Sequence, residues 1–237
     1  MRLDKFLSHV GLGSRKEVKV LLKKGKITVN GQAIKQPQIN VNEYDDDIRF
    51  DDEVLVYRLH DYFIMNKPAD VLSATVDAVD ATVIDLLQDN DYRDNLFPVG
   101  RLDKDTTGLL LITNNGQLAH QLLSPKRHVK KVYRALVKGP LPSDVEEQFQ
   151  SGLMLDGEQL QPALITVLNN YQEEVDVEVT ITEGKYHQVK RMFELVGSKV
   201  YQLERIAMGP LTLPSDLERG TYRRLTLEEE QLLLNKN

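Results

Sequence analysis

The sequence of 237 residues contains no cysteine, no tryptophan and no long apolar run. Without cysteine the chain can form no disulfide, no thiolate metal site and no cysteine nucleophile. No apolar stretch approaches the roughly 18 residues of a membrane-spanning helix, and the opening Met1–Asp4 shows no signal-peptide pattern. We therefore expect a cytoplasmic protein that makes no membrane contact. The five histidines have no metal-ligand spacing, so we also expect no metal site.

Positive charge is scarce overall but is concentrated at one end. The net charge of −6 by itself argues against a nucleic-acid partner. Nine of the 30 Lys and Arg residues, however, lie within residues 1–35, with only two of the 36 Asp and Glu residues. A basic segment joined to an acidic body is typical of a separate module that binds a polyanion.

Residues 3–10 and 14–24 have the apolar spacing of two short helices. Ser14 and Glu17 predict a capping box at the start of the second helix. Residues 27–34 predict a hairpin that turns at Asn30-Gly31. A solvated helix face is one interpretation of the basic residues here, but the scarcity of acidic neighbours favours phosphate contacts. The residues expected to bind RNA in this way are Arg2, Lys5, Arg15, Lys16, Lys19 and Lys23.

The composition changes after residue 35. Residues 36–53 are polar and acidic, residues 54–57 predict a last short strand, and we place a domain boundary near residue 60. Beyond it, apolar patterns predict both strands and helices. The helices are expected at 83–88 (capped by Thr82), 116–123 (capped by Asn115), 142–149 (capped by Ser143), 186–196 and 227–234, and strands at 62–66, 109–113, 132–137, 175–181 and 201–208.

The stretch Gly100–Gly116 combines a polar turn with a strand. Leu109–Thr113 is short and aliphatic, which predicts a buried strand, and Asp103 and Asp105 lie just before it. Charged residues at the end of a buried strand often mark a functional site. The alternative is a solvated turn in which one of the acids makes a local backbone hydrogen bond. This stretch alone favours the alternative.

Several other segments resemble the motifs of known families, and they occur in the same order as in those families. Residues 2–7, 13–17 and 24–31 resemble the S4 RNA-binding domain. Gly100–Leu111 resembles the catalytic motif of the pseudouridine synthases, and Lys131-x-Tyr133 and Glu183–Met192 resemble two further motifs of that family. Asn66-Lys67-Pro68 resembles its opening lysine–proline. The third motif and residues 213–226 are most similar to the RsuA/RluB/RluE/RluF branch, which also carries an S4 domain.

The resemblance implies a fold, a partner and a reaction. The fold would be α+β, with a small S4 domain (residues 1–59) followed by a catalytic domain (60–237) that has a mixed, mainly antiparallel sheet and flanking helices. The reaction would be isomerisation of uridine to pseudouridine, by base flipping, in 16S rRNA or in a small-subunit assembly intermediate, with no DNA partner. The protein would act as a monomer. The reaction breaks C1′–N1 and joins C1′ to C5 without redox change, so we expect no cofactor.

The resemblance also assigns roles to residues of the second domain. Asp103 would be the catalytic carboxylate, attacking C1′ or C6 or deprotonating C2′. Tyr133 would stack on the target uracil, and Arg101 would occupy the space that the flipped base leaves. A cation on helix 186–196 would keep the carboxylate ionised, with Lys190 as first candidate and Arg191 as second.

One acidic and one basic residue near this motif are expected to be structural. Asp105 falls at a variable position, and Lys67 with Pro68 would support the site. Two other functions stay open: the same reaction on 23S rRNA, or a non-enzymatic S4-type ribosome-binding factor. The second leaves the combination of Asp103, Tyr133 and Lys190 unexplained.

Overall fold

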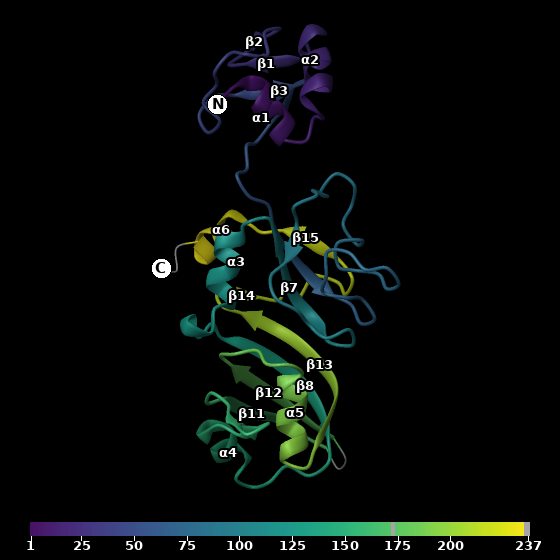
Figure 1. Ribbon diagram of the computed structural model, residues 1–237, viewed down its shortest axis with the longest axis vertical. Helices are drawn as coiled ribbons and strands as arrows, with labels where there is room; N and C mark the ends of the chain where they lie inside the picture. Colours follow the sequence, from purple (N-terminus) through teal and green to yellow (C-terminus); the bar gives the residue numbers. More distant parts are fainter. Residues whose placement is uncertain (172–173, 235–237) are drawn as a thin grey trace. The chain divides into compact units, whose positions relative to one another are not determined.

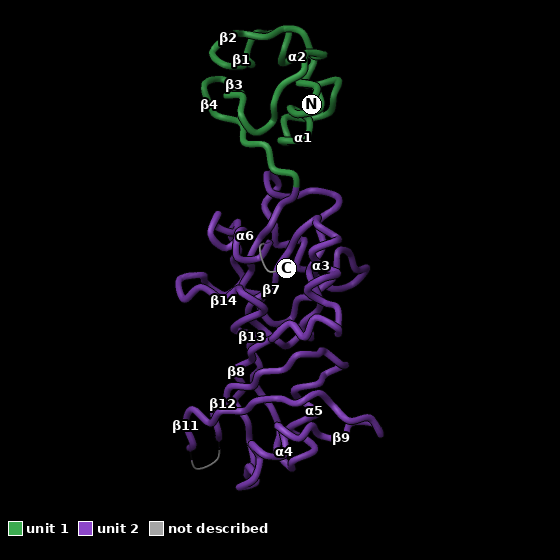
Figure 2. The backbone as a smooth tube through the Cα atoms, turned by 90° about the vertical axis from the view of Figure 1, so that its left-hand side faces the viewer, with its two compact units in different colours: residues 1–59 green, residues 60–237 purple. Residues whose placement is uncertain are grey.

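The basic head and the acidic remainder of the chain fold as two units, Met1–Leu59 and His60–Asn237 (Figure 2). The computed structural model describes residues 1–171 and 174–234. Each unit has its own apolar core. Among the helices of the described residues, none has the length and apolar character needed to span a lipid bilayer.

The first unit packs two helices against a small antiparallel sheet. Ser14 and Glu17 form the predicted capping box, with the Glu17 carboxylate accepting from Ser14 N at 2.8 Å. Asn30 and Gly31 both have positive φ, 51° and 78°, as a two-residue hairpin turn requires, so the predicted hairpin is confirmed. The elements are α1 (Leu3–His9), α2 (Arg15–Lys23), β1 (Ile27–Val29), β2 (Gln32–Ala33), β3 (Ile48–Phe50) and β4 (Glu53–Val54), with strand order β2-β1-β3-β4.

The second unit is built on one long sheet with the strand order β11-β12-β8-β13-β7-β5-β15 (Figure 1). Its strands are β5 (Tyr62–Lys67), β7 (Thr107–Thr113), β8 (Lys131–Lys138), β11 (Leu164–Asn170), β12 (Glu174–Ile181), β13 (Lys199–Met208) and β15 (Tyr222–Arg224). Two short strands extend it: β6 (Phe97–Pro98) pairs with β7, and β14 (Leu211–Thr212) pairs with β13. Among the described strand pairs, all are antiparallel except β7–β13. The expected α+β fold with a mixed, mainly antiparallel sheet is confirmed.

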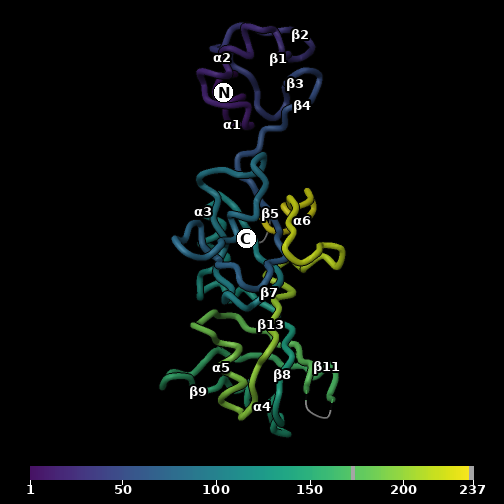
Figure 3. The backbone as a smooth tube through the Cα atoms, turned by 90° about the vertical axis from the view of Figure 1, so that its right-hand side faces the viewer, coloured from purple at the N-terminus to yellow at the C-terminus, as the bar shows by residue number. Residues whose placement is uncertain are grey.

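Helices cover both faces of this sheet (Figures 1 and 3). Leu109 and Leu111 of β7 pack in one core cluster with α3 and α6, whereas Leu110 and Ile112 face the other cluster, which includes α5. Every residue of β7 is buried, because the strand is covered on both faces. A strand in this position is typically a continuous apolar run. The helices are α3 (Gly116–Leu123), α4 (Val145–Ser151), α5 (Gln188–Leu195) and α6 (Leu227–Leu234), and a separate hairpin pairs β9 (Met154–Leu155) with β10 (Glu158–Gln159).

The two halves of the sheet meet where β7 runs parallel to β13. Gly108 lies opposite Arg205 and has a φ of +98°, and a Cβ atom built there would be 2.4 Å from the Arg205 carbonyl oxygen. The buried Arg205 side chain donates Nε to the Leu109 carbonyl at 2.8 Å. A glycine is therefore required for the close approach of these strands. The polar 100–106 loop leads directly into this junction.

One helix predicted from the sequence is absent, and the starts of two others need correction. Residues 83–88 form turns rather than a helix, and Thr82 donates its N–H and hydroxyl to Asp85 Oδ2 instead of capping. Helix α4 spans Val145–Ser151 rather than 142–149, and Asp144, not Ser143, stands at its N-cap position. Helix α5 begins at Gln188, because His187 before it is left-handed with φ 48°.

Candidate active site

A pocket of about 940 Å³ lies in the second unit, at the 100–106 loop. Arg101, Asp103 and Tyr133, expected in the site from sequence, all line it. The other walls come from residues 72–75, strands β8 and β13, and the 181–189 segment that leads into α5. A volume of this size can enclose a nucleoside-sized ligand.

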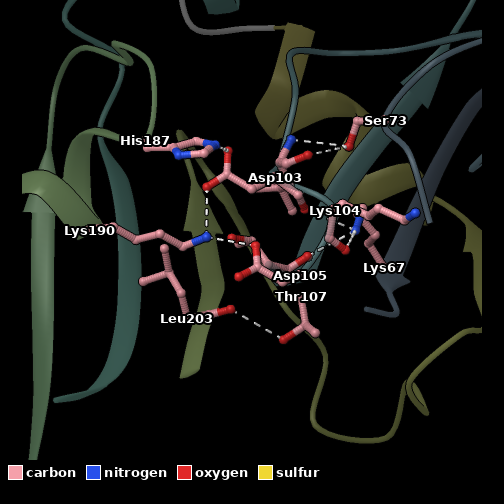
Figure 4. A network of polar contacts seen from close by, with 11 residues as sticks. Lys67, Ser73, Asp103, Lys104, Asp105, Thr107, His187, Lys190 and Leu203 are labelled. Atoms are coloured by element: carbon pink, nitrogen blue, oxygen red, sulfur yellow. Dashed lines mark hydrogen bonds and ion pairs between the residues drawn. The ribbon is translucent and has the colours of Figure 1, made fainter. Parts of the chain in front are cut away.

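The Asp103 carboxylate lies against two side chains from the start of α5 (Figure 4). Lys190 Nζ is 3.1 Å from Asp103 Oδ2, and His187 Nε2 is 3.5 Å from Oδ1. Arg191 points elsewhere and pairs with Asp156, at 2.5 Å, in the turn between β9 and β10. The structure thus brings Lys190, and not Arg191, to the carboxylate.

Lys190 also contacts a second acid. Its Nζ is 2.6 Å from Asp105 Oδ1, closer than to Asp103 (Figure 4). Burial pulls the pKa of Lys190 down, but the hydrogen bonds to Asp105 and Asp103 raise it overall, so the ammonium stays charged at neutral pH. Burial likewise opposes the effect of Lys190 on Asp105, whose pKa is nevertheless lowered. Asp105, expected only to shape the turn, shares the cation of Asp103; no local pattern could have revealed this.

Lys67 holds the backbone of the 100–106 loop from beneath. Its side chain is fully buried, and burial lowers its pKa to about 8 despite the nearby charges of Asp105 and Asp103. Its Nζ donates to the carbonyl oxygens of Pro68 (2.9 Å), Asp103 (3.3 Å), Lys104 (3.2 Å) and Thr106 (3.0 Å). These contacts agree with the expectation that Lys67 supports the site.

Ser73 fixes the same loop from the other side and was missed in the sequence. Its hydroxyl donates to the Leu102 carbonyl and accepts from the Leu102 N–H, both at 3.1 Å. A lone serine in a polar stretch carries no sequence signal. Together with Lys67 it clamps the backbone on both sides of Asp103, so that the carboxylate is presented in one position.

Two further basic side chains are buried in the pocket wall. Lys131, two residues before Tyr133, is 8% exposed, and burial together with the charge of Arg205 lowers its pKa. Arg205 is 2% exposed, and within the described residues one of its terminal nitrogens has no hydrogen-bond partner. These two cations, with Arg101, make the pocket suited to an anionic ligand.

The candidate RNA-binding residues of the first unit are all exposed, but they differ in their partners. Arg2 donates two hydrogen bonds to the buried Asp4, at 3.0 and 2.7 Å, so part of its charge is used inside the unit. Within residues 1–171 and 174–234 no ion pair engages the others, which are Lys5, Arg15, Lys16, Lys19 and Lys23.

Comparison with known proteins identifies relatives over the whole chain. The family model described as RNA pseudouridylate synthase matches residues 61–195, and the S4 domain model matches residues 1–47. An uncharacterised RNA pseudouridine synthase of Bacillus subtilis (strain 168) is 44% identical over 237 residues, covering 100% of this chain and 99% of the relative. Ribosomal small subunit pseudouridine synthase A of Escherichia coli (strain K12) is 38% identical over 232 residues, covering 97% and 98%. A crystal structure of a pseudouridylate synthase matches with a TM-score of 0.68 at 35% identity, covering 99% of this chain and 100% of the other.

Proposed function

The chain belongs to the RNA pseudouridylate synthase family, and on this premise we propose that it isomerises one specific uridine of 16S rRNA to pseudouridine. The relatives named as small-subunit enzymes support the choice of 16S rRNA. The observation that carries the catalytic assignment is the Asp103 carboxylate, which lines the pocket with Lys190 Nζ 3.1 Å away. The substrate is the free rRNA or a small-subunit assembly intermediate, and the enzyme acts as a monomer.

The reaction needs an ionised carboxylate next to the ribose and base. Asp103 attacks C1′ or C6, or takes the proton from C2′, and in each route the Lys190 ammonium, 3.1 Å away, pairs with the charge of the carboxylate. The glycosidic bond C1′–N1 breaks, the uracil turns within the pocket, and C1′ joins C5. C5 then loses its proton and N1 gains one, so substrate and product are isomers.

Two other pocket residues handle the base. Tyr133 is almost fully buried in β8, where its ring can lie against the uracil. Arg101 is exposed at the pocket and can occupy the space left in the RNA when the uridine flips out. Residues 1–59 supply phosphate contacts as an S4 domain, while residues 60–237 perform the chemistry.

Mapping of pseudouridine in both rRNAs tests activity and substrate together. A strain lacking the gene is compared with its parent by carbodiimide-based mapping, and is complemented with the wild type or with Asp103→Asn. We expect one 16S signal to vanish and to return only with the wild-type gene. Loss of a 23S signal instead would overturn the 16S assignment, and unchanged maps would leave only the role of an S4-type ribosome-binding factor.

A further inference from the structure

Two tyrosines line the pocket, and they differ sharply in exposure. Tyr133 is 8% exposed, whereas Tyr186, in the segment before α5, is 73% exposed. The Tyr186 ring lies nearly parallel to the His187 imidazole, with ring centroids 3.8 Å apart and an interplanar angle of 17°. With His187 on one side, this degree of exposure leaves the opposite face of the ring open to solvent.

The segment that carries Tyr186 is fixed on both sides. His187 lies 3.5 Å from Asp103. Before it, Lys185 N donates to Gln188 Oε1 at 2.9 Å, and Gln188 Nε2 in turn donates to Glu183 Oε1 at 3.0 Å. A ring held in this way loses little conformational freedom when a ligand stacks on it, and rigid placement of an aromatic side chain favours binding.

The chemistry that suits such a ring is the face of a nucleobase. We propose that Tyr186 is a stacking platform for the base next to the target uridine in the RNA. The inference rests on the proposed function, because it takes the pocket to hold a flipped uridine. Flipping removes a stacking partner from the neighbouring base, and an aromatic ring at the pocket wall replaces that partner.

The two pocket tyrosines then have different ligands. Tyr133 is too buried to meet a second base once a uracil fills the pocket, whereas Tyr186 is accessible from outside. The stack of base, Tyr186 and His187 reaches Asp103 through the His187 contact.

The test combines protein variants with altered RNA. The substrate RNA is assembled by ligation around the mapped uridine, with the nucleotide on its 5′ or its 3′ side either intact or abasic. The proteins are the wild type, Tyr186→Phe, Tyr186→Ala and the control Tyr171→Ala. Tyr171 is 59% exposed and lies in the same unit but does not line the pocket.

We expect Tyr186→Ala to raise KM by about 5- to 150-fold, the range for loss of one base–aromatic stack, with the loss in KM rather than in kcat. Tyr171→Ala should match the wild type, and Tyr186→Phe, which keeps the ring, should recover most of the affinity that Tyr186→Ala loses. Removal of the neighbouring base on one side should raise the KM of the wild type by a similar factor and leave the KM of Tyr186→Ala unchanged. If that abasic penalty is the same in both proteins, or if Tyr186→Ala loses kcat alone, the platform is ruled out.

The same comparison is repeated as binding affinity, which needs no turnover. Turnover of the wild type on intact RNA reports on the proposed function, while the dependence of the abasic penalty on Tyr186 reports on the platform. A protein that binds with this dependence but forms no pseudouridine would keep the platform and remove the enzymatic assignment. Formation of pseudouridine with an abasic penalty that does not depend on Tyr186 would keep the enzymatic assignment and remove the platform.

Discussion

The ammonium of Lys190, on α5, lies 3.1 Å from Oδ2 of Asp103, on the loop before β7. The Lys190 side chain is 18% exposed and that of Asp103 26%. Opposite charges this close in a partly buried site attract each other more strongly than an exposed pair does. This contact joins two segments far apart in the chain and leads to the first two predictions.

Lys190→Met should lower kcat at least about tenfold, because removal of one partner leaves the other charge poorly compensated in a partly buried site. Arg191→Met is the matched control on the same helix, since Arg191 pairs with the exposed Asp156. It should retain near-normal turnover, as measured by release of tritium from RNA that is labelled at C5 of its uridines. A larger loss in Arg191→Met than in Lys190→Met would make Arg191 the supporting cation.

Asp103→Asn should abolish turnover while RNA affinity is retained, because the amide can act neither as nucleophile nor as base. Asp105→Asn removes the same charge two residues later, from a side chain that is 71% exposed. Asp105→Asn should lower the turnover rate less than about fivefold, since an exposed ion pair is worth at most about 1 kcal/mol. Single-turnover assays with filter binding separate chemistry from affinity. Equal losses in both variants would show that the two carboxylates act as one unit.

Gly108→Ala should destabilise the second unit by more than about 2 kcal/mol, because the new methyl group meets the Arg205 carbonyl and the backbone is left-handed. Gly116→Ala at the start of α3 is the control, because open space surrounds that position. Urea unfolding measures both. Comparable stability of the two variants would mean that the β7–β13 contact adjusts easily.

Lys67 should make stability depend on alkaline pH. Its pKa is lowered by burial to about 8 in the folded chain, from an ordinary 10.5, so between these values the unfolded chain retains a proton that the folded chain has released. Its contribution to the free energy of unfolding therefore rises with pH, by up to about 1.4 kcal/mol per pH unit. The free energy of unfolding of the wild type minus that of Lys67→Met, measured in urea, should rise from pH 8 to 10.

Lys104→Met is the control for this titration. The hydrogen bond with Asp80 raises the pKa of Lys104, so this lysine stays protonated in both states over the same range. The difference in free energy of unfolding between the wild type and Lys104→Met should stay constant from pH 8 to 10. A flat difference for Lys67→Met as well would show that its four carbonyl partners keep the ammonium protonated.

Replacing Lys16, Lys19 and Lys23 with alanine should weaken RNA binding and reduce the slope of log Kd against log salt by about two to three, because each contacted phosphate releases counterions. Lys26→Ala is the control in the same unit, since Lys26 already pairs with Asp51. Titrations at several salt concentrations measure both. Parallel salt lines for the triple variant and the wild type would mean that this face does not meet phosphate.

Local patterns in the sequence were sufficient wherever one element decides its own structure. The Ser14–Glu17 capping box, the Asn30-Gly31 turn, the buried strand β7 and the Asn115 cap of α3 all follow from residues within a few positions of each other. The motif resemblance added the fold class and the candidate carboxylate. The predicted helix at 83–88 failed because Asp85 binds the Thr82 N–H in a turn, and apolar spacing alone does not register that competition.

The sequence by itself thus determined the family, the α+β class and the candidate Asp103. Only the tertiary structure decided which cation meets that carboxylate, that Asp105 shares it, and that Lys67 and Ser73 hold the loop. Lys190 and Arg191 are adjacent in the sequence and alike in charge, but successive residues on a helix point in different directions. The position of α5 on the sheet, which many distant contacts set together, brings Lys190 to Asp103 and Arg191 to Asp156.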